Sequence, residues 1–151
     1  MKIPQKNRIV CTLLLICTLI LDQWTKYLVS IASDLPYTLI PNFARITLHR
    51  NSGIAFSIPL PQPIIYVLIV VLIFFGGRYL LKEIDLSKPL TMIVLAFIFG
   101  GTLGNLIDRI RLGYVIDFIS IWKFAVFNVA DIAITCGIGI LILWYSKLKN
   151  K

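Results

Sequence analysis

Residues 124–145 read FAVFNVADIAITCGIGILILWY, an apolar run whose only charged side chain is Asp131. At 1.5 Å per residue, a helix over this run is long enough to cross the ~30 Å hydrocarbon core of a bilayer. Lipid offers the backbone no hydrogen-bonding partner, so a membrane-crossing run must be helical. The stretch therefore predicts a membrane-spanning helix that carries an acid within the membrane.

Three further apolar runs cover residues of about 9–31, 64–81 and 90–106. Across all 151 residues, 58% are hydrophobic and 15% are charged, whereas soluble domains carry roughly 45–50% apolar and ~25% charged residues. This composition excludes a large soluble catalytic domain. We expect residues 1–151 to form a single integral-membrane domain of the all-α class, a bundle of four transmembrane helices.

Lysine and arginine gather on one side of this predicted bundle. An even number of spans places both termini on the same side, and nine of the fifteen basic residues fall there. They are Lys2, Lys6, Arg8, Arg78, Lys82, Lys88, Lys147, Lys149 and Lys151. The positive-inside rule then predicts that both termini are cytoplasmic. Because span ends account for most of the net charge of +8, we expect no nucleic-acid partner.

Two loops remain on the outer side. The first contains residues 37–41 and 45–49, where polar and apolar residues alternate, which is typical of strands. We expect a small extracytoplasmic β-sheet there, on the outer membrane surface. The second, residues 109–123, is predicted to be a short apolar loop.

Polar side chains within the spans lie at related depths. Three of them come roughly 20 to 24 Å from the cytoplasmic helix ends, in the outer third of the membrane. These are Asp22, Asn105 and Asp131. A second group, Lys26, Asp108 and Arg109, lies about one helical turn nearer the outer surface. An ionisable group at the membrane centre costs at least ~2.5–3.5 kcal/mol, so these residues require explanation.

Several of them have purely structural interpretations. Asp22 and Lys26 are spaced i, i+4 with the acid first, which favours an ion pair. Asp108 beside Arg109 could be an anchor at the membrane interface. The GxxxG pattern at 100–104 favours close helix packing.

Asp131 has no basic residue within one turn of its own helix, so its partner must come from another segment. The candidate is Asp117, in the short outer loop just before the fourth span. Two carboxylates in one site of low dielectric cannot both ionise easily, which leaves one as a base and the other as an acid. An aspartic protease needs this pair to activate water and polarise a carbonyl. The spacing also allows a proton relay or a structural pair.

Five segments together resemble the motif set of bacterial lipoprotein signal peptidase, also called signal peptidase II. They are residues 22–26 (DQWTK), 51–56 (NSGIAF), 100–109 (GGTLGNLIDR), 115–118 (VIDF) and 127–131 (FNVAD). The resemblance implies an aspartyl endopeptidase of the bacterial inner membrane. Its family removes the signal peptide from diacylglyceryl-modified prolipoproteins, cutting just before the lipidated cysteine.

The resemblance also assigns roles to residues. It implies that Asp117 and Asp131 are catalytic and that the active site faces the outer leaflet. Substrate-binding or supporting residues would be Asn51, Gly53, Asn105, Arg109, Asn128 and Ala130, with Asp22, Lys26 and Asp108 behind them. The implied partners are the lipidated prolipoprotein and membrane phospholipid, without a metal or other cofactor, and we expect a monomer.

Two other functions are compatible with the residues alone. In a small transporter or proton-coupled carrier, Asp22, Lys26 and Asp131 would form a relay. In a non-catalytic assembly factor, the polar layer would bind a partner helix.

Overall fold

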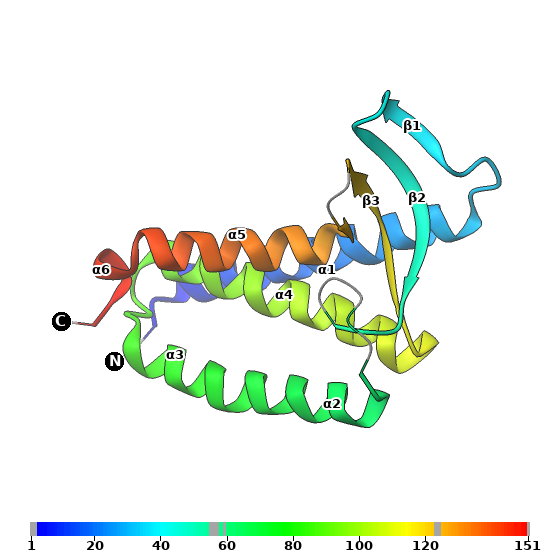
Figure 1. Ribbon diagram of the computed structural model, residues 1–151. Helices are drawn as coiled ribbons and strands as arrows, with labels where there is room; N and C mark the ends of the chain where they lie inside the picture. Colours follow the sequence, from blue (N-terminus) through cyan, green and yellow to red (C-terminus); the bar gives the residue numbers. More distant parts are fainter. Residues whose placement is uncertain (1–2, 55–57, 59, 123–124, 151) are drawn as a thin grey trace.

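The computed structural model describes residues 3–54, 58, 60–122 and 125–150. Helices lie side by side, and a small sheet covers one end of them (Figure 1). The helical elements are α1 (Gln5–Ile31), α2 (Gln62–Val71), the π-helical η2 (Leu72–Gly76), α3 (Gly77–Glu83), α4 (Pro89–Leu112), α5 (Val129–Leu143) and α6 (Tyr145–Leu148). The strands are β1 (Tyr37–Ile40), β2 (Ala44–Asn51), β3 (Val115–Ile121) and β4 (Val126–Phe127).

Among the described residues, three helical stretches are long and apolar enough to cross a membrane. They are Gln5–Ile31, Gln62–Glu83 and Pro89–Leu112, which correspond to the first three predicted spans. The second stretch joins α2, η2 and α3 in one helix, called the second helix below. The chain is thus a multi-pass membrane protein by the length and composition of its helices.

The fourth predicted span, 124–145, is too long at both ends. Among its described residues, Val126–Phe127 form β4, and α5 covers only Val129–Leu143. The helix begins late because Asn128 is extended and its side chain accepts a hydrogen bond from the Asp131 backbone N–H, which is the usual way to start a helix. This helix is shorter than the three candidate spans.

The prediction of a loop over 109–123 is wrong. The α4 helix continues to Leu112, with Arg109 and Arg111 in its last turn, where cations are favourable. It ends at Gly113, whose φ of 81° suits glycine. The chain then enters β3, so Asp117 lies on a strand rather than in a loop.

The four strands form an antiparallel sheet in the order β1-β2-β3-β4. The predicted strand pair is therefore confirmed as β1 and β2, and β3 and β4 extend it. In the register of β2 and β3, His49 lies opposite Asp117 and Asn51 opposite Val115. This pairing brings the end of β2 beside the start of β3, where Asp117 lies.

The α4 helix packs against both α1 and α5. A Cβ atom on Gly104 would lie 2.5 Å from Asp22 Oδ2, and one on Gly101 would collide with the carbonyl oxygen of Ala130. Only glycine permits these approaches, so the predicted close packing at 100–104 is confirmed. The polar side chains of three helices can meet because their backbones lie so near.

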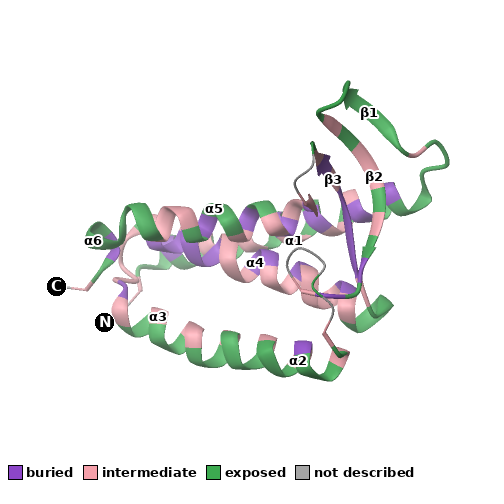
Figure 2. Cartoon of the chain, viewed as in Figure 1, coloured by how far each residue is buried: buried purple, intermediate pink, exposed green. Residues whose placement is uncertain are grey.

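The second helix is mostly exposed, in contrast to α4 (Figure 2). It reaches α4 near the sheet through Tyr66, whose hydroxyl donates to the Arg109 carbonyl at 2.8 Å. At the other end, Ile84 and Leu148 pack with Met92 in an apolar cluster. Between these two contacts, most of the second helix is exposed.

Candidate active site

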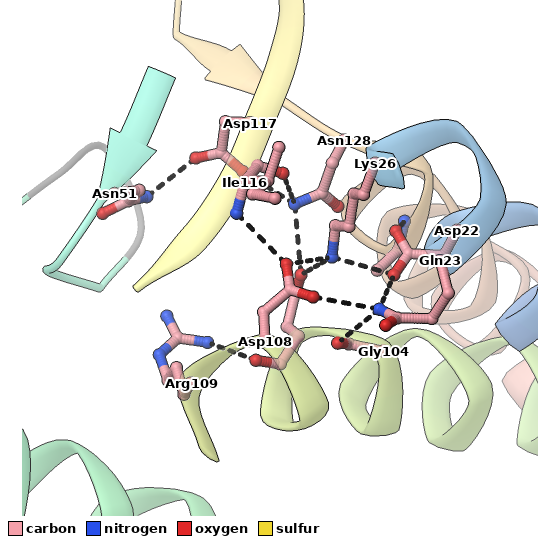
Figure 3. A network of polar contacts seen from close by, with 12 residues as sticks. Asp22, Gln23, Lys26, Asn51, Gly104, Asp108, Arg109, Ile116, Asp117 and Asn128 are labelled. Atoms are coloured by element: carbon pink, nitrogen blue, oxygen red, sulfur yellow. Dashed lines mark hydrogen bonds and ion pairs between the residues drawn. The ribbon is translucent and has the colours of Figure 1, made fainter. Parts of the chain in front are cut away.

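A buried lysine lies between two acids at the sheet end of the helices (Figure 3). Lys26 Nζ is 2.8 Å from Asp22 Oδ2 and 2.9 Å from Asp108 Oδ2, and the three side chains are 0–4% exposed. The ion pair predicted from the i, i+4 spacing is confirmed. Asp108 is a second acid partner and not an anchor at the membrane surface, since it is buried.

Asp108 also positions the sheet. Its Oδ2 accepts a hydrogen bond from the Ile116 backbone N–H at 3.1 Å, which fixes β3 against α4. Gln23, which was not among the predicted site residues, donates to Asp22 Oδ2 at 3.2 Å and to Asp108 Oδ1 at 3.0 Å. Its position between Asp22 and Lys26 in the DQWTK segment was the signal in the sequence that could have identified it as a site residue.

Asp22 connects α1 to the start of α5. Its Oδ1 accepts a hydrogen bond from the Ala130 backbone N–H at 2.9 Å, and both residues are fully buried. The first turn of α5 is therefore held at the depth of the lysine cluster.

Asn128 links the two candidate catalytic carboxyls. Its side-chain amide donates to Asp117 Oδ1 at 2.7 Å, and its backbone N–H donates to Asp131 Oδ2 at 3.2 Å. Asn51 donates to the other Asp117 oxygen at 2.9 Å, and Asn105 donates to Asp131 Oδ1 at 2.8 Å. Asn128 therefore contacts both carboxyls and joins them in one hydrogen-bond network.

Asn105 joins this carboxyl pair to the lysine cluster. Its Oδ1 accepts from Lys26 Nζ at 3.0 Å and from the Asn128 amide at 3.1 Å. The expectation that Asp22, Asn105 and Asp131 lie at one level is thereby confirmed through their shared contacts.

Asp117 and Asp131 differ in their surroundings. Asp117 is only 2% exposed, whereas Asp131 is partly exposed. Burial, and to a lesser extent the neighbouring Asp131 carboxylate, raises the pKa of Asp117 to about 6, although the amides of Asn51 and Asn128 act in the opposite direction. Asp131 lies in the first turn of α5, where the helix N-terminus favours a negative charge.

Arg109 lies on the side of the pair nearest the segment that follows β2. One guanidinium nitrogen donates to the Gly53 carbonyl at 3.0 Å, and the other reaches the Asn105 carbonyl at 3.4 Å. Asn51 Oδ1 accepts from the Gly53 backbone N–H at 3.0 Å. All eleven residues predicted for the site therefore lie in one connected set of hydrogen bonds and ion pairs.

No group of three metal-ligating acids, histidines or cysteines occurs in the part of the chain that the structure describes.

The family model described as signal peptidase (SPase) II matches residues 14–147 of this sequence. The chain belongs to the signal peptidase II family. It is 38% identical to the lipoprotein signal peptidase of Brevibacillus brevis over 129 residues, which cover 82% of this chain and 85% of that protein. It is 36% identical to that of Halalkalibacterium halodurans over 141 residues, covering 88% and 89%.

The fold of this signal peptidase II family member also resembles a solved structure. A bacterial membrane enzyme determined by the in meso method at 2.3 Å resolution superposes with a TM-score of 0.80 and 28% identity, covering 91% of this chain and 87% of that one. The family and these relatives confirm that the chain is a peptidase.

Proposed function

We propose that this protein removes the signal peptide from diacylglyceryl-modified prolipoproteins, cutting just before the lipidated cysteine, with Asp117 and Asp131 as its catalytic pair. The observation that carries the proposal is the bridge through Asn128, which holds a buried and a partly exposed carboxyl on either side of one amide residue. The names of the relatives, lipoprotein signal peptidases, support the choice of substrate.

The different surroundings of the two acids suit different roles. Asp131 is the base: it takes a proton from water as the water oxygen attacks the scissile carbonyl. Asp117, whose raised pKa favours its acid form, donates its proton to the carbonyl oxygen. When the tetrahedral intermediate collapses, the proton on Asp131 passes to the leaving amine and a hydroxyl of the intermediate returns one to Asp117. The pair thus regains its starting state, and the cleavage needs no metal.

The remaining residues of the site would hold the substrate. Asn51, Gly53 and Arg109 join the outer loop to α4 beside the carboxyls, so they are placed to bind peptide backbone. Asn105, Asn128 and Ala130 would line the cleavage site. Asp22, Lys26 and Asp108 would support them from within the bundle.

The depth of the site suits a lipidated substrate. The acyl chains of a diacylglyceryl cysteine stay in the membrane, so the bond to be cut lies near its outer surface. The exposed Trp24 and Tyr27 near the sheet end of α1 have the amphipathic character of interfacial residues.

We infer that the chain forms a single domain in the inner membrane, with α5 as its fourth span. Both termini are cytoplasmic, the site faces the outer leaflet, and the monomer contacts phospholipid.

The experiment is cleavage of a lipidated and an unlipidated precursor by the purified protein. We expect only the lipidated precursor to be cut, and Asp117→Asn or Asp131→Asn to abolish cleavage while the protein still inserts in membranes. Asp34→Asn, which changes an exposed acid outside the network, is the matched control and should cleave normally. Wild-type turnover by either of these two variants would contradict the assignment of Asp117 and Asp131 as the catalytic pair. Ion flux into liposomes without any cleavage would support a carrier instead.

A further inference from the structure

A groove with a volume of about 740 Å³ follows the second helix on the side that faces Phe99 of α4. Val70, Phe74 and Gly77 contribute apolar surface to it, and a Cβ atom on Gly77 would lie 3.4 Å from Phe99 Cζ. The groove runs from Val70, about 6 Å along the helix from Tyr66, to Lys82, roughly 24 Å from Tyr66, the residue that contacts Arg109 near the carboxyl pair. None of the residues that line it belongs to the candidate active site. It is therefore separate from the candidate active site.

The groove is apolar along its length and basic at one end. Arg78 and Lys82 line that end, and their i, i+4 spacing places them on one face of the helix. Within the described residues, the ion pairs involve other lysines, so neither of these two cations is paired with an acid. A ligand that matches this surface has an apolar chain and an anionic head.

The length of the groove matches one half of a membrane. From Val70 to Lys82 the helix rises about 18 Å at 1.5 Å per residue, close to half of the ~30 Å hydrocarbon core. The Arg78–Lys82 end, about 6 Å long, would take the head group, and the remaining ~12 Å from Arg78 to Val70 would lie beside the acyl chain of a single leaflet. The signal peptide of a substrate is a poor occupant, because its positively charged first segment would meet Arg78 and Lys82 at the same depth.

We propose that this groove binds an anionic phospholipid of the cytoplasmic leaflet, with its phosphate at Arg78 and Lys82 and an acyl chain extending to Val70. Basic pockets between helices on the cytoplasmic side are typical sites for anionic lipid head groups. The π-helical η2 segment supplies Ile73 and Phe74 to the middle of the groove, and such interruptions are frequent at functional sites. The leaflet follows from the orientation proposed above, whereas the site itself does not depend on the catalytic pair.

The test measures binding of phosphatidylglycerol and phosphatidylcholine to the purified, delipidated full chain by native mass spectrometry. Arg78→Gln combined with Lys82→Gln should weaken phosphatidylglycerol binding about thirtyfold, at roughly fivefold for each basic side chain. Lys6→Gln combined with Lys147→Gln removes the same charge at the same end outside the groove, and should leave binding unchanged. Val70→Trp fills the far end of the groove and should weaken binding with both cations present.

Two further arms identify the ligand. Glycerol 3-phosphate, a head group without chains, should not displace the lipid, and Asp117→Asn should bind phosphatidylglycerol like the wild type. Equal losses in the two double variants, equal binding of phosphatidylcholine, or displacement by a synthetic signal peptide would overturn the proposal. Because the readout is binding, these results are independent of whether the protein cleaves prolipoproteins.

Discussion

Replacing Lys26 with methionine tests the buried cluster directly. The variant keeps most of the apolar stem but removes the charge that lies 2.8 Å from Asp22 and 2.9 Å from Asp108. Two buried acids then lose their shared counter-charge, and breaking a buried pair in this way costs about 3–5 kcal/mol. The matched control is Lys88→Met, whose pair with Asp85 is 3.5 Å long and partly exposed, and which should cost about 0–1 kcal/mol.

The free energy of unfolding would be measured in mixed micelles, with tryptophan fluorescence as the probe of folding. Adding Asp22→Asn and Asp108→Asn to Lys26→Met removes the uncompensated charges, so the triple variant should recover at least half of the loss. The reasoning is refuted if Lys26→Met costs no more than Lys88→Met, or if the triple variant is less stable than Lys26→Met alone.

The remaining predictions concern the carboxyl pair, the helix packing and the substrate. Asp131→Asn removes a charge that raises the pKa of Asp117, so the carboxyl infrared band of Asp117 should titrate near pH 6 in the wild type and at lower pH in the variant. An unchanged midpoint would contradict their coupling. Gly104→Ala places a methyl group 2.5 Å from a buried carboxylate oxygen and should lower stability by about 1–3 kcal/mol. Gly139→Ala is the control: the added methyl group would lie in open space, so stability should not fall. Arg109→Ala should lower kcat/KM about 10- to 100-fold, chiefly through KM. An equal loss of folded protein would instead assign it a structural role.

The apolar runs predicted the first three spans because lipid demands long uninterrupted helices. The depth of Asp22, Asn105 and Asp131 followed from the helical rise alone. The ion pair between Lys26 and Asp108 could not be predicted in this way. It depends on how α1 packs against α4, and no spacing along the chain encodes that packing.

Strand β3 was missed because it lacks the pattern that revealed β1 and β2. Its residues Val115 to Phe118 are all buried, so polar and apolar residues do not alternate, and a buried strand cannot be told from other short apolar runs. The late start of α5 had a visible signal. Asn128 is followed three residues later by Asp131, a capping pattern that the hydropathy of the run 124–145 concealed.

Asn128 has one side-chain oxygen and one amide nitrogen, and both atoms make hydrogen bonds within the site. The oxygen begins α5, while the nitrogen serves Asp117. Aspartate in its place could begin the helix but would set a third acid against the pair, and serine has a single polar atom to offer. The start of α5 and the link between the carboxyls therefore depend on one side chain, so a substitution at Asn128 would disturb the helix and the carboxyl pair together.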